Sequence, residues 1–142
     1  TRTVVHGAIS DQIQGMHAAV VAAKEAAVKT LRTGVKGSTV HQATVDTLNA
    51  HGFAFGFPGK DQPSDAVTMP HGTGHGLGLA VHEPPLLDDK GVALVKGDVV
   101  TIEPGLYGTL VGGMRVEDVY AIQDGGATKL GGTLHEGLTW SG

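Results

Sequence analysis

His71-Gly-Thr-Gly-His75-Gly-Leu-Gly-Leu-Ala-Val-His82-Glu83-Pro-Pro is the stretch that says most about the fold of this 142-residue chain. His71 and His75 stand four residues apart, which is the spacing of a zinc-binding histidine pair on a helix. A helix is disfavoured here because each interior glycine costs about 1 kcal/mol, and glycine occupies every second position from Gly72 to Gly78. We therefore expect extended chain from Val67 to Val81.

Alternate side chains of a strand share one face. The residues that follow His75 at even spacing are apolar, whereas those of the opposite face are glycine or alanine. Small side chains on one face leave room for a substrate backbone to approach. His82 has the opposite parity to His75, so the chain has to bend or bulge between them if both reach one site. The alternative interpretation is that the histidines are structural and satisfied by hydrogen bonds.

A second informative stretch contains two glutamates, in Thr101-Ile-Glu103-Pro-Gly and in Met114-Arg115-Val-Glu117-Asp118. Asp98–Glu103 and Met114–Ile122 both have strand character, and a hairpin centred near Leu110 would place Glu103 opposite Glu117. Like charges across a ladder are destabilising, and a cation or a proton between the carboxylates relieves the repulsion. Arg115 shares the face of Glu117 and can orient a carboxylate or bind a substrate group. A solvent-exposed hairpin with balanced charge is the alternative.

One histidine and two glutamates around one point predict a site for a divalent metal. Oxygen-rich ligand sets favour Mn²⁺ or Mg²⁺, and histidine adds affinity for Zn²⁺, Co²⁺ or Fe²⁺. A metal of this kind acidifies bound water, which can then attack a carbonyl compound.

The rest of the chain completes an α+β class. Ser10 or Asp11 begins a helix with apolar residues at helical spacing to Leu31, and a second helix runs from Gly37 to His51. These helices should pack as a hairpin on a curved antiparallel sheet. The net charge of −4 argues against nucleic acid as a partner, and no apolar run is long enough to span a membrane. Cysteine is absent, which is compatible with the cytoplasmic location that we expect.

Three motifs together resemble the pita-bread metallopeptidases. The histidine stretch looks like that family's histidine motif, Thr-Ile-Glu103-Pro-Gly-Leu-Tyr like its first glutamate motif, and Gly-Met-Arg115-Val-Glu117-Asp like its second. The order and spacing also agree, and the likeness to Xaa-Pro aminopeptidases and prolidases exceeds that to methionine aminopeptidases. The resemblance implies a pita-bread fold and hydrolysis of Xaa-Pro peptide bonds by a metal-bridging hydroxide.

The resemblance also implies a role for each site residue. His75, Glu103 and Glu117 would bind metal, with Glu103 also moving protons and Glu117 bridging two ions. His82 would stabilise the tetrahedral intermediate through the substrate carbonyl, His71 would lie near the prolyl group, and Arg115 would support the metal-site network. The expected cofactor is two divalent ions, with manganese first and cobalt, zinc or iron as alternatives.

The family's ligand set has two further aspartates, which would precede the opening Thr1-Arg-Thr. Residues 1–142 are therefore expected to form the C-terminal part of the catalytic domain, with an incomplete site and no activity alone. The expected substrate is a peptide with proline at its second position, and the oligomeric state is open, with a homodimer as one candidate. The alternatives are a creatinase-like hydrolase or lyase of the same fold, and a non-catalytic pita-bread module.

Overall fold

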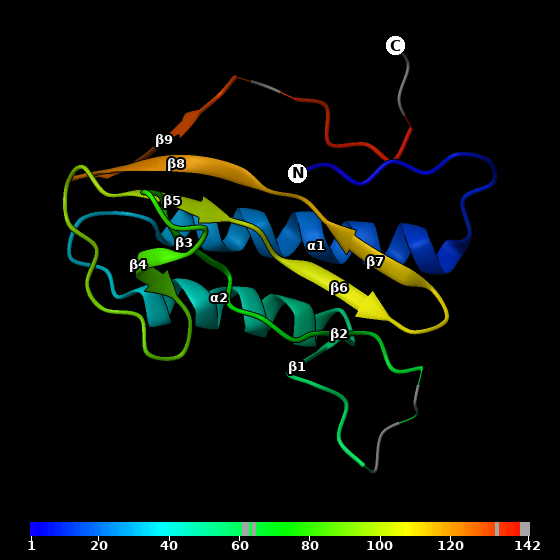
Figure 1. Cartoon of the computed structure of the whole chain (residues 1–142). Coiled ribbons are helices and arrows are strands. Elements are labelled where there is room, and N and C mark those ends of the chain that lie inside the picture. Colours follow the sequence, from blue (N-terminus) through cyan, green and yellow to red (C-terminus); the bar gives the residue numbers. More distant parts are fainter. Residues whose placement is uncertain (61–62, 64, 133, 140–142) are drawn as a thin grey trace.

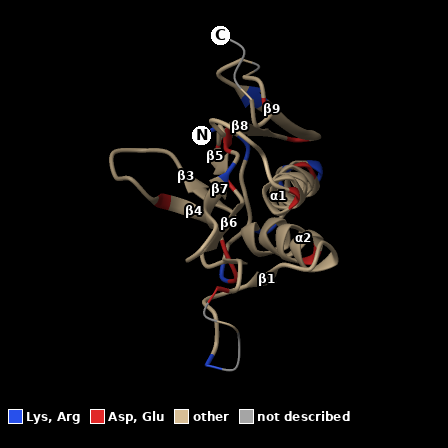
Figure 2. Cartoon of the chain, turned by 90° about the vertical axis from the view of Figure 1, so that its right-hand side faces the viewer, with Lys and Arg blue, Asp and Glu red and all other residues tan. Residues whose placement is uncertain are grey.

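The structure is a computed structural model that describes residues 1–60, 63, 65–132 and 134–139. Two helices lie on one side of the β-strands, and a loop projects from the strands on the opposite side (Figure 2). The elements are α1 (Asp11–Thr30), α2 (Gly37–Ala50), β1 (Ala54–Phe55), β2 (Thr68–Met69), β3 (Gly74–Gly76), β4 (Glu83–Leu87), β5 (Val99–Ile102), β6 (Gly105–Gly108), β7 (Gly112–Arg115), β8 (Asp118–Gln123) and β9 (Gly126–Leu130).

Both predicted helices are present, with ends close to those expected from local capping signals. The Ser10 hydroxyl caps α1 by accepting the Ile13 N–H at 3.3 Å, which satisfies one of the free donors of the first turn. Gly34 and Gly52 follow the two helices with φ of +84°, a backbone conformation that glycine adopts without steric cost. No helix among the described residues is long and apolar enough to cross a membrane.

The strands form two sheets instead of the single curved sheet that the sequence predicted. One sheet has the order β1-β2-β6-β7 and the other has the order β4-β3-β5-β8-β9. Figure 1 shows β5 leading into β6 and β7 into β8 where the two sheets meet. Pairing is antiparallel except between β1 and β2, which are parallel. Glu103-Pro104 separates β5 from β6 at the junction, where proline cannot donate a ladder hydrogen bond.

The predicted hairpin centred near Leu110 crosses both sheets. Ile102 pairs with Asp118 in one sheet, and Gly105 pairs with Arg115 in the other, in the same register. Glu103 and Glu117 therefore lie opposite each other at the junction, as the sequence predicted, between the two paired segments.

Two clusters of buried side chains hold the helices against the sheets. The first joins α1 and the end of α2 to the β1-β2-β6-β7 sheet, and the second joins the same helices to the larger sheet. Ile102 and Val116, which flank the two glutamates, are 0% and 1% exposed. The glutamates are therefore set beside an apolar core, in agreement with the prediction.

A network of buried charges ties both ends of the chain to the hairpin. The Asp118 carboxylate accepts from Lys24 Nζ at 2.6 Å, from Arg2 at 2.8 Å and from Lys129 Nζ at 2.9 Å. Lys24 also pairs with Glu136. Because these partners come from distant parts of the chain, sequence reasoning gave Asp118 no role of its own.

Candidate metal and peptide site

The extended stretch predicted from Val67 to Val81 is wrong for most of its length. Only Thr68–Met69 and Gly74–Gly76 are strands, and residues 77–82 form the projecting loop between β3 and β4. A side chain at Gly74 would collide with the backbone of Thr101, and one at Gly76 with the backbone of Pro84. These glycines therefore admit the protein's own neighbouring strands, instead of the substrate backbone that the sequence suggested.

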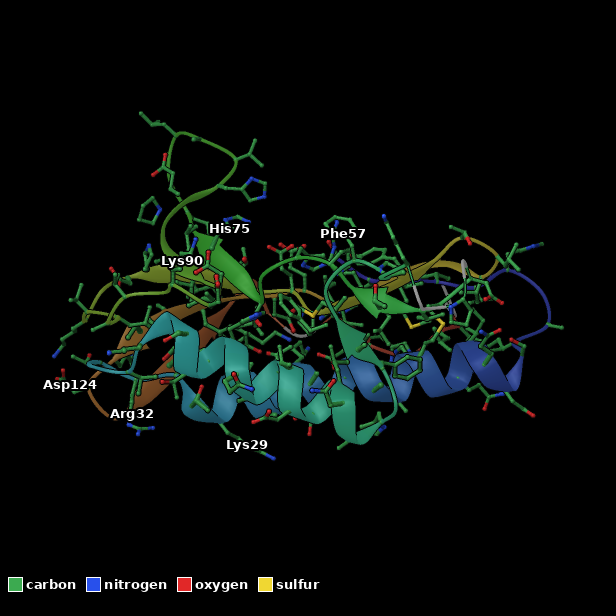
Figure 3. The ribbon with its side chains drawn as sticks, turned by 90° about the horizontal axis from the view of Figure 1, so that it is seen from below. Lys29, Arg32, Phe57, His75, Lys90 and Asp124 are labelled. Carbon is green, nitrogen blue, oxygen red and sulfur yellow. The ribbon has the colours of Figure 1, made fainter. Side chains whose placement is uncertain are left out.

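The loop brings His75 and His82 together despite their opposite parity. Their rings are in an edge-to-face arrangement with centroids 4.7 Å apart. The β3–β4 register shifts between Gly74 and Gly76, so the predicted bend is present. Figure 3 shows His75 below this loop, on the side of the strands that faces away from the helices.

His75 faces Glu103 with the ring nitrogen that can bind a metal. Its Nδ1 lies 2.9 Å from the Gly76 carbonyl oxygen, and only a protonated Nδ1 can donate to that acceptor. The neutral ring then has a lone pair on Nε2, which lies 3.2 Å from Oε1 of Glu103. A divalent cation or a proton between these two acceptors satisfies both, and a backbone carbonyl that fixes the other nitrogen is typical of metal-binding histidines.

Thr101 joins these two residues through its hydroxyl group. It accepts the His75 N–H at 3.0 Å and donates to Oε1 of Glu103 at 3.1 Å. Thr101 is 3% exposed, so water does not compete for these bonds. Sequence reasoning missed Thr101, although its position two residues before Glu103 on the same face of the chain was an available signal.

Arg115 approaches the other oxygen of the Glu103 carboxylate. Its guanidinium lies 3.6 Å from Oε2 of Glu103. Its Nε is buried and has no hydrogen-bond partner among the described residues. A buried donor without a partner costs free energy, so this nitrogen is suited to a further acceptor at the site.

Glu117 lies opposite Glu103 across the hairpin, but its carboxylate points toward Thr1. Oε2 of Glu117 is 3.2 Å from the Thr1 nitrogen and also accepts from the Thr1 hydroxyl. Burial alone would raise the pKa of Glu117, but these Thr1 contacts and the charge of Arg115 outweigh it and lower the pKa. In the described part of the chain, no group of three His, Cys, Asp or Glu side chains is arranged to hold a metal ion.

His71 is held on the far side of the site. Its Nδ1 lies 2.7 Å from the Gly72 carbonyl oxygen, and its Nε2 accepts the Tyr107 hydroxyl at 3.0 Å. Burial raises the pKa of Tyr107, more than Arg115 lowers it, so this phenol stays protonated as a donor. Tyr107 was a second residue without a predicted role.

A cavity with a volume of about 420 Å³ lies at the site, within the range of ligand pockets. Five of the six predicted site residues belong to its lining: His71, His75, His82, Glu103 and Arg115. Glu117 is the predicted residue outside that lining. The lining carries three imidazoles, the guanidinium of Arg115 and the carboxylates of Asp88 and Glu103, which suits a cation and an anionic or carbonyl-containing ligand.

His41, a buried residue of α2 that was not predicted to belong to the site, contacts the glycine-rich stretch. Nδ1 of His41 lies 2.9 Å from the hydroxyl of Thr73, and the Thr73 carbonyl accepts the Glu103 N–H at 2.8 Å. Burial lowers the pKa of His41, although the charges of Asp88 and Asp89 oppose the shift. This pairing positions the segment between His71 and His75.

Comparison with known proteins gives a consistent family and fold. The model of metallopeptidase family M24 matches residues 1–124. The peptidase YqhT of Bacillus subtilis is 36% identical over 127 residues, which cover 89% of this chain and 33% of that protein. The Xaa-Pro dipeptidase of Pyrococcus furiosus is 30% identical over 137 residues, covering 96% of this chain and 36% of the relative.

A solved structure shows the same arrangement of elements. The X-Pro aminopeptidase of Thermotoga maritima superposes with a TM-score of 0.81 at 28% identity, covering 97% of this chain and 36% of that one. This likeness confirms the predicted α+β class and the C-terminal part of a pita-bread fold. The chain spans about a third of the length of these relatives.

Proposed function

The chain belongs to metallopeptidase family M24, and from this premise we propose that it forms part of a metal-dependent peptidase that cleaves Xaa-Pro peptide bonds. The observation that carries the proposal is the pairing of Nε2 of His75 with Oε1 of Glu103 at 3.2 Å. The names of the Pyrococcus furiosus and Thermotoga maritima proteins support the choice of Xaa-Pro peptides.

His75, Glu103 and Glu117 are the proposed metal ligands. The residues present fit a divalent metal, because His75 has its Nδ1 committed to a carbonyl and its Nε2 directed at a carboxylate. Glu117 would join them by exchanging its contact with Thr1 for the metal. A metal bound here would supply acidified water and polarise the substrate carbonyl. Manganese is the proposed ion, with cobalt, zinc or iron as alternatives.

Three protein ligands are too few to clamp two ions, so further carboxylates have to complete the centre. The free Nε of Arg115 is a suitable partner for one of them, because an arginine donor orients a carboxylate well. We propose that residues 1–142 bind metal weakly alone and act in the cytoplasm as part of the complete catalytic domain. A homodimer is one candidate for the oligomeric state.

The side chains around the metal ligands have distinct proposed roles. Glu103 holds or moves a proton beside the scissile bond, since it lies within the cavity. His82 is exposed on the projecting loop and can donate to the substrate carbonyl as charge develops there. His71, held by Tyr107, lies beside the prolyl ring. Arg115 keeps the Glu103 carboxylate in place.

Metal binding by the chain tests the ligand assignment. Titration of Mn²⁺ or Zn²⁺ into the wild type, followed by calorimetry, should give a binding signal that His75→Ala and Glu103→Gln abolish. His51→Ala is the control, because His51 is exposed at the end of α2. Equal binding by His75→Ala and His51→Ala would contradict the proposed site.

Activity tests the reaction class. The chain, alone and extended to the length of its relatives, should be assayed with Gly-Pro and Gly-Ala peptides in Mn²⁺. We expect turnover of Gly-Pro peptides only in the longer protein. Turnover of creatine or small acids without peptide hydrolysis would instead support the creatinase-like alternative, and comparable turnover by the short chain would refute the incomplete site.

A further inference from the structure

Asp88 is a charged residue of the cavity lining that takes no part in the proposed metal site. It directly follows β4 and lines the same cavity as His71, His75 and Arg115. A Cβ atom added at Gly72 would lie 3.3 Å from Cβ of Asp88, so Asp88 stands beside the residue that follows His71. Asp88 therefore belongs to the part of the wall nearest His71.

The negative charge of Asp88 is not neutralised within the described part of the chain. Its Oδ1 accepts the backbone N–H of Lys90 at 2.9 Å, which orients the carboxylate without supplying a cation. Arg115 is the one guanidinium of the lining and lies 3.6 Å from Glu103, and no ion pair between described residues includes Asp88. Because a neutral imidazole carries no charge, the lining has more carboxylates than permanent cations.

The charge of Asp88 acts over the whole cavity. A cavity of about 420 Å³ is roughly 9 Å across, which is shorter than the Debye length of about 10 Å at 0.1 M salt. A metal ion would leave this charge in place, because its proposed ligands Glu103 and Glu117 and the further carboxylates of the centre balance the charge of the metal. A ligand with a free carboxylate near His71 is therefore repelled, whereas a neutral group at the same position is not.

We propose that Asp88 is a specificity-determining residue that selects substrates without a free carboxylate on the prolyl residue. The inference rests on the proposed function, in which the prolyl ring lies beside His71. An Xaa-Pro dipeptide has its C-terminal carboxylate on that residue, so Asp88 repels it. An amide or a peptide bond at the same position carries no charge. The substrate class is therefore Xaa-Pro peptides in which the carboxyl group of proline is blocked by an amide or a peptide bond.

Hydrolysis by the protein extended to the length of its relatives tests this selection. We would measure kcat/KM in Mn²⁺ for Gly-Pro and Gly-Pro-amide, which differ in the charge of one terminal group. Gly-Pro-amide should be preferred about tenfold at low salt, and the preference should shrink as salt screens Asp88. Asp88→Asn should remove most of the preference by raising kcat/KM for Gly-Pro, and what remains should not depend on salt. Asparagine keeps an oxygen that can accept the Lys90 N–H, so the variant should fold.

Asp89→Asn is the matched control, because Asp89 is the neighbouring carboxylate and is exposed, but it is not among the described residues that line the cavity. It should retain the preference for Gly-Pro-amide and its dependence on salt. Equal kcat/KM for the two substrates, or a preference that both variants change alike, would overturn the selection by Asp88 and leave the peptidase proposal intact. Hydrolysis of neither substrate would refute the proposed function and the selection together.

Discussion

Replacing Asp118 by alanine should be among the most destabilising substitutions in the chain. Its side chain is 7% exposed and the Lys24 side chain is 4% exposed, with 2.6 Å between Nζ and Oδ2. Removing one partner of a buried ion pair costs about 3–5 kcal/mol, because the other charge stays buried. Lys24 retains Glu136 as a partner, so we expect a loss near the lower end, about 3 kcal/mol.

That loss would be a large part of the total, since domains have free energies of unfolding of about 5–15 kcal/mol. Urea denaturation at pH 7 measures it, from the midpoint and slope of the transition. Asp124→Ala is the matched control, because Asp124 pairs with Lys96 at 2.7 Å while their side chains are 70% and 66% exposed. Such surface pairs contribute about 0–1 kcal/mol. Similar losses in the two variants would show that the Asp118 network does not act as a buried charge cluster.

Three further predictions concern pH, packing and the metal site. Burial alone would raise the pKa of Asp118, but hydrogen bonds from Lys24, Arg2 and Lys129 outweigh it and hold the pKa well below its usual range. Its contribution to stability is therefore complete above about pH 5 and should fall at lower pH, where acid protonates this carboxylate in the unfolded chain; urea midpoints from pH 7 to pH 3 check this, and Asp118→Asn should flatten the decline. Gly74→Ala should lower the thermal midpoint by several degrees, since its Cβ would collide with the Thr101 backbone, whereas Gly125→Ala, with open space around it, should not. Thr101→Val should weaken Mn²⁺ binding about 10-fold or more, with Thr101→Ser restoring it; unchanged calorimetric affinity in the valine variant would rule out the hydroxyl as a positioning group.

The features that local interactions determine were readable in the sequence. Ser10 and the apolar spacing after it predicted α1, because capping and helical periodicity depend on residues within a few positions. The hairpin around Leu110 followed from two strand-like runs, and it correctly placed Glu103 opposite Glu117. The glycines between His71 and His75 also excluded a helix correctly.

The metal-site geometry depended on contacts between distant segments. Only the tertiary structure showed that Gly74 and Gly76 admit neighbouring backbone, and that residues 77–82 leave the sheet so that His82 meets His75. The alternation of side chains along a strand shows which residues lie on the same face. It does not show where the strand ends, because pairing with the neighbouring strands determines that.

The histidine motif from His71 to His82 therefore predicted the residue types of the site but not its shape. One histidine and two opposed carboxylates, at His75, Glu103 and Glu117, predicted a divalent metal, and this stays a prediction. The orientation of Glu117 toward Thr1 and the Asp118 network were decided by the tertiary structure. Thr1, the partner of Glu117, and Lys24, one partner of Asp118, lie 116 and 94 residues away along the chain, and folding alone brings them within hydrogen-bonding distance.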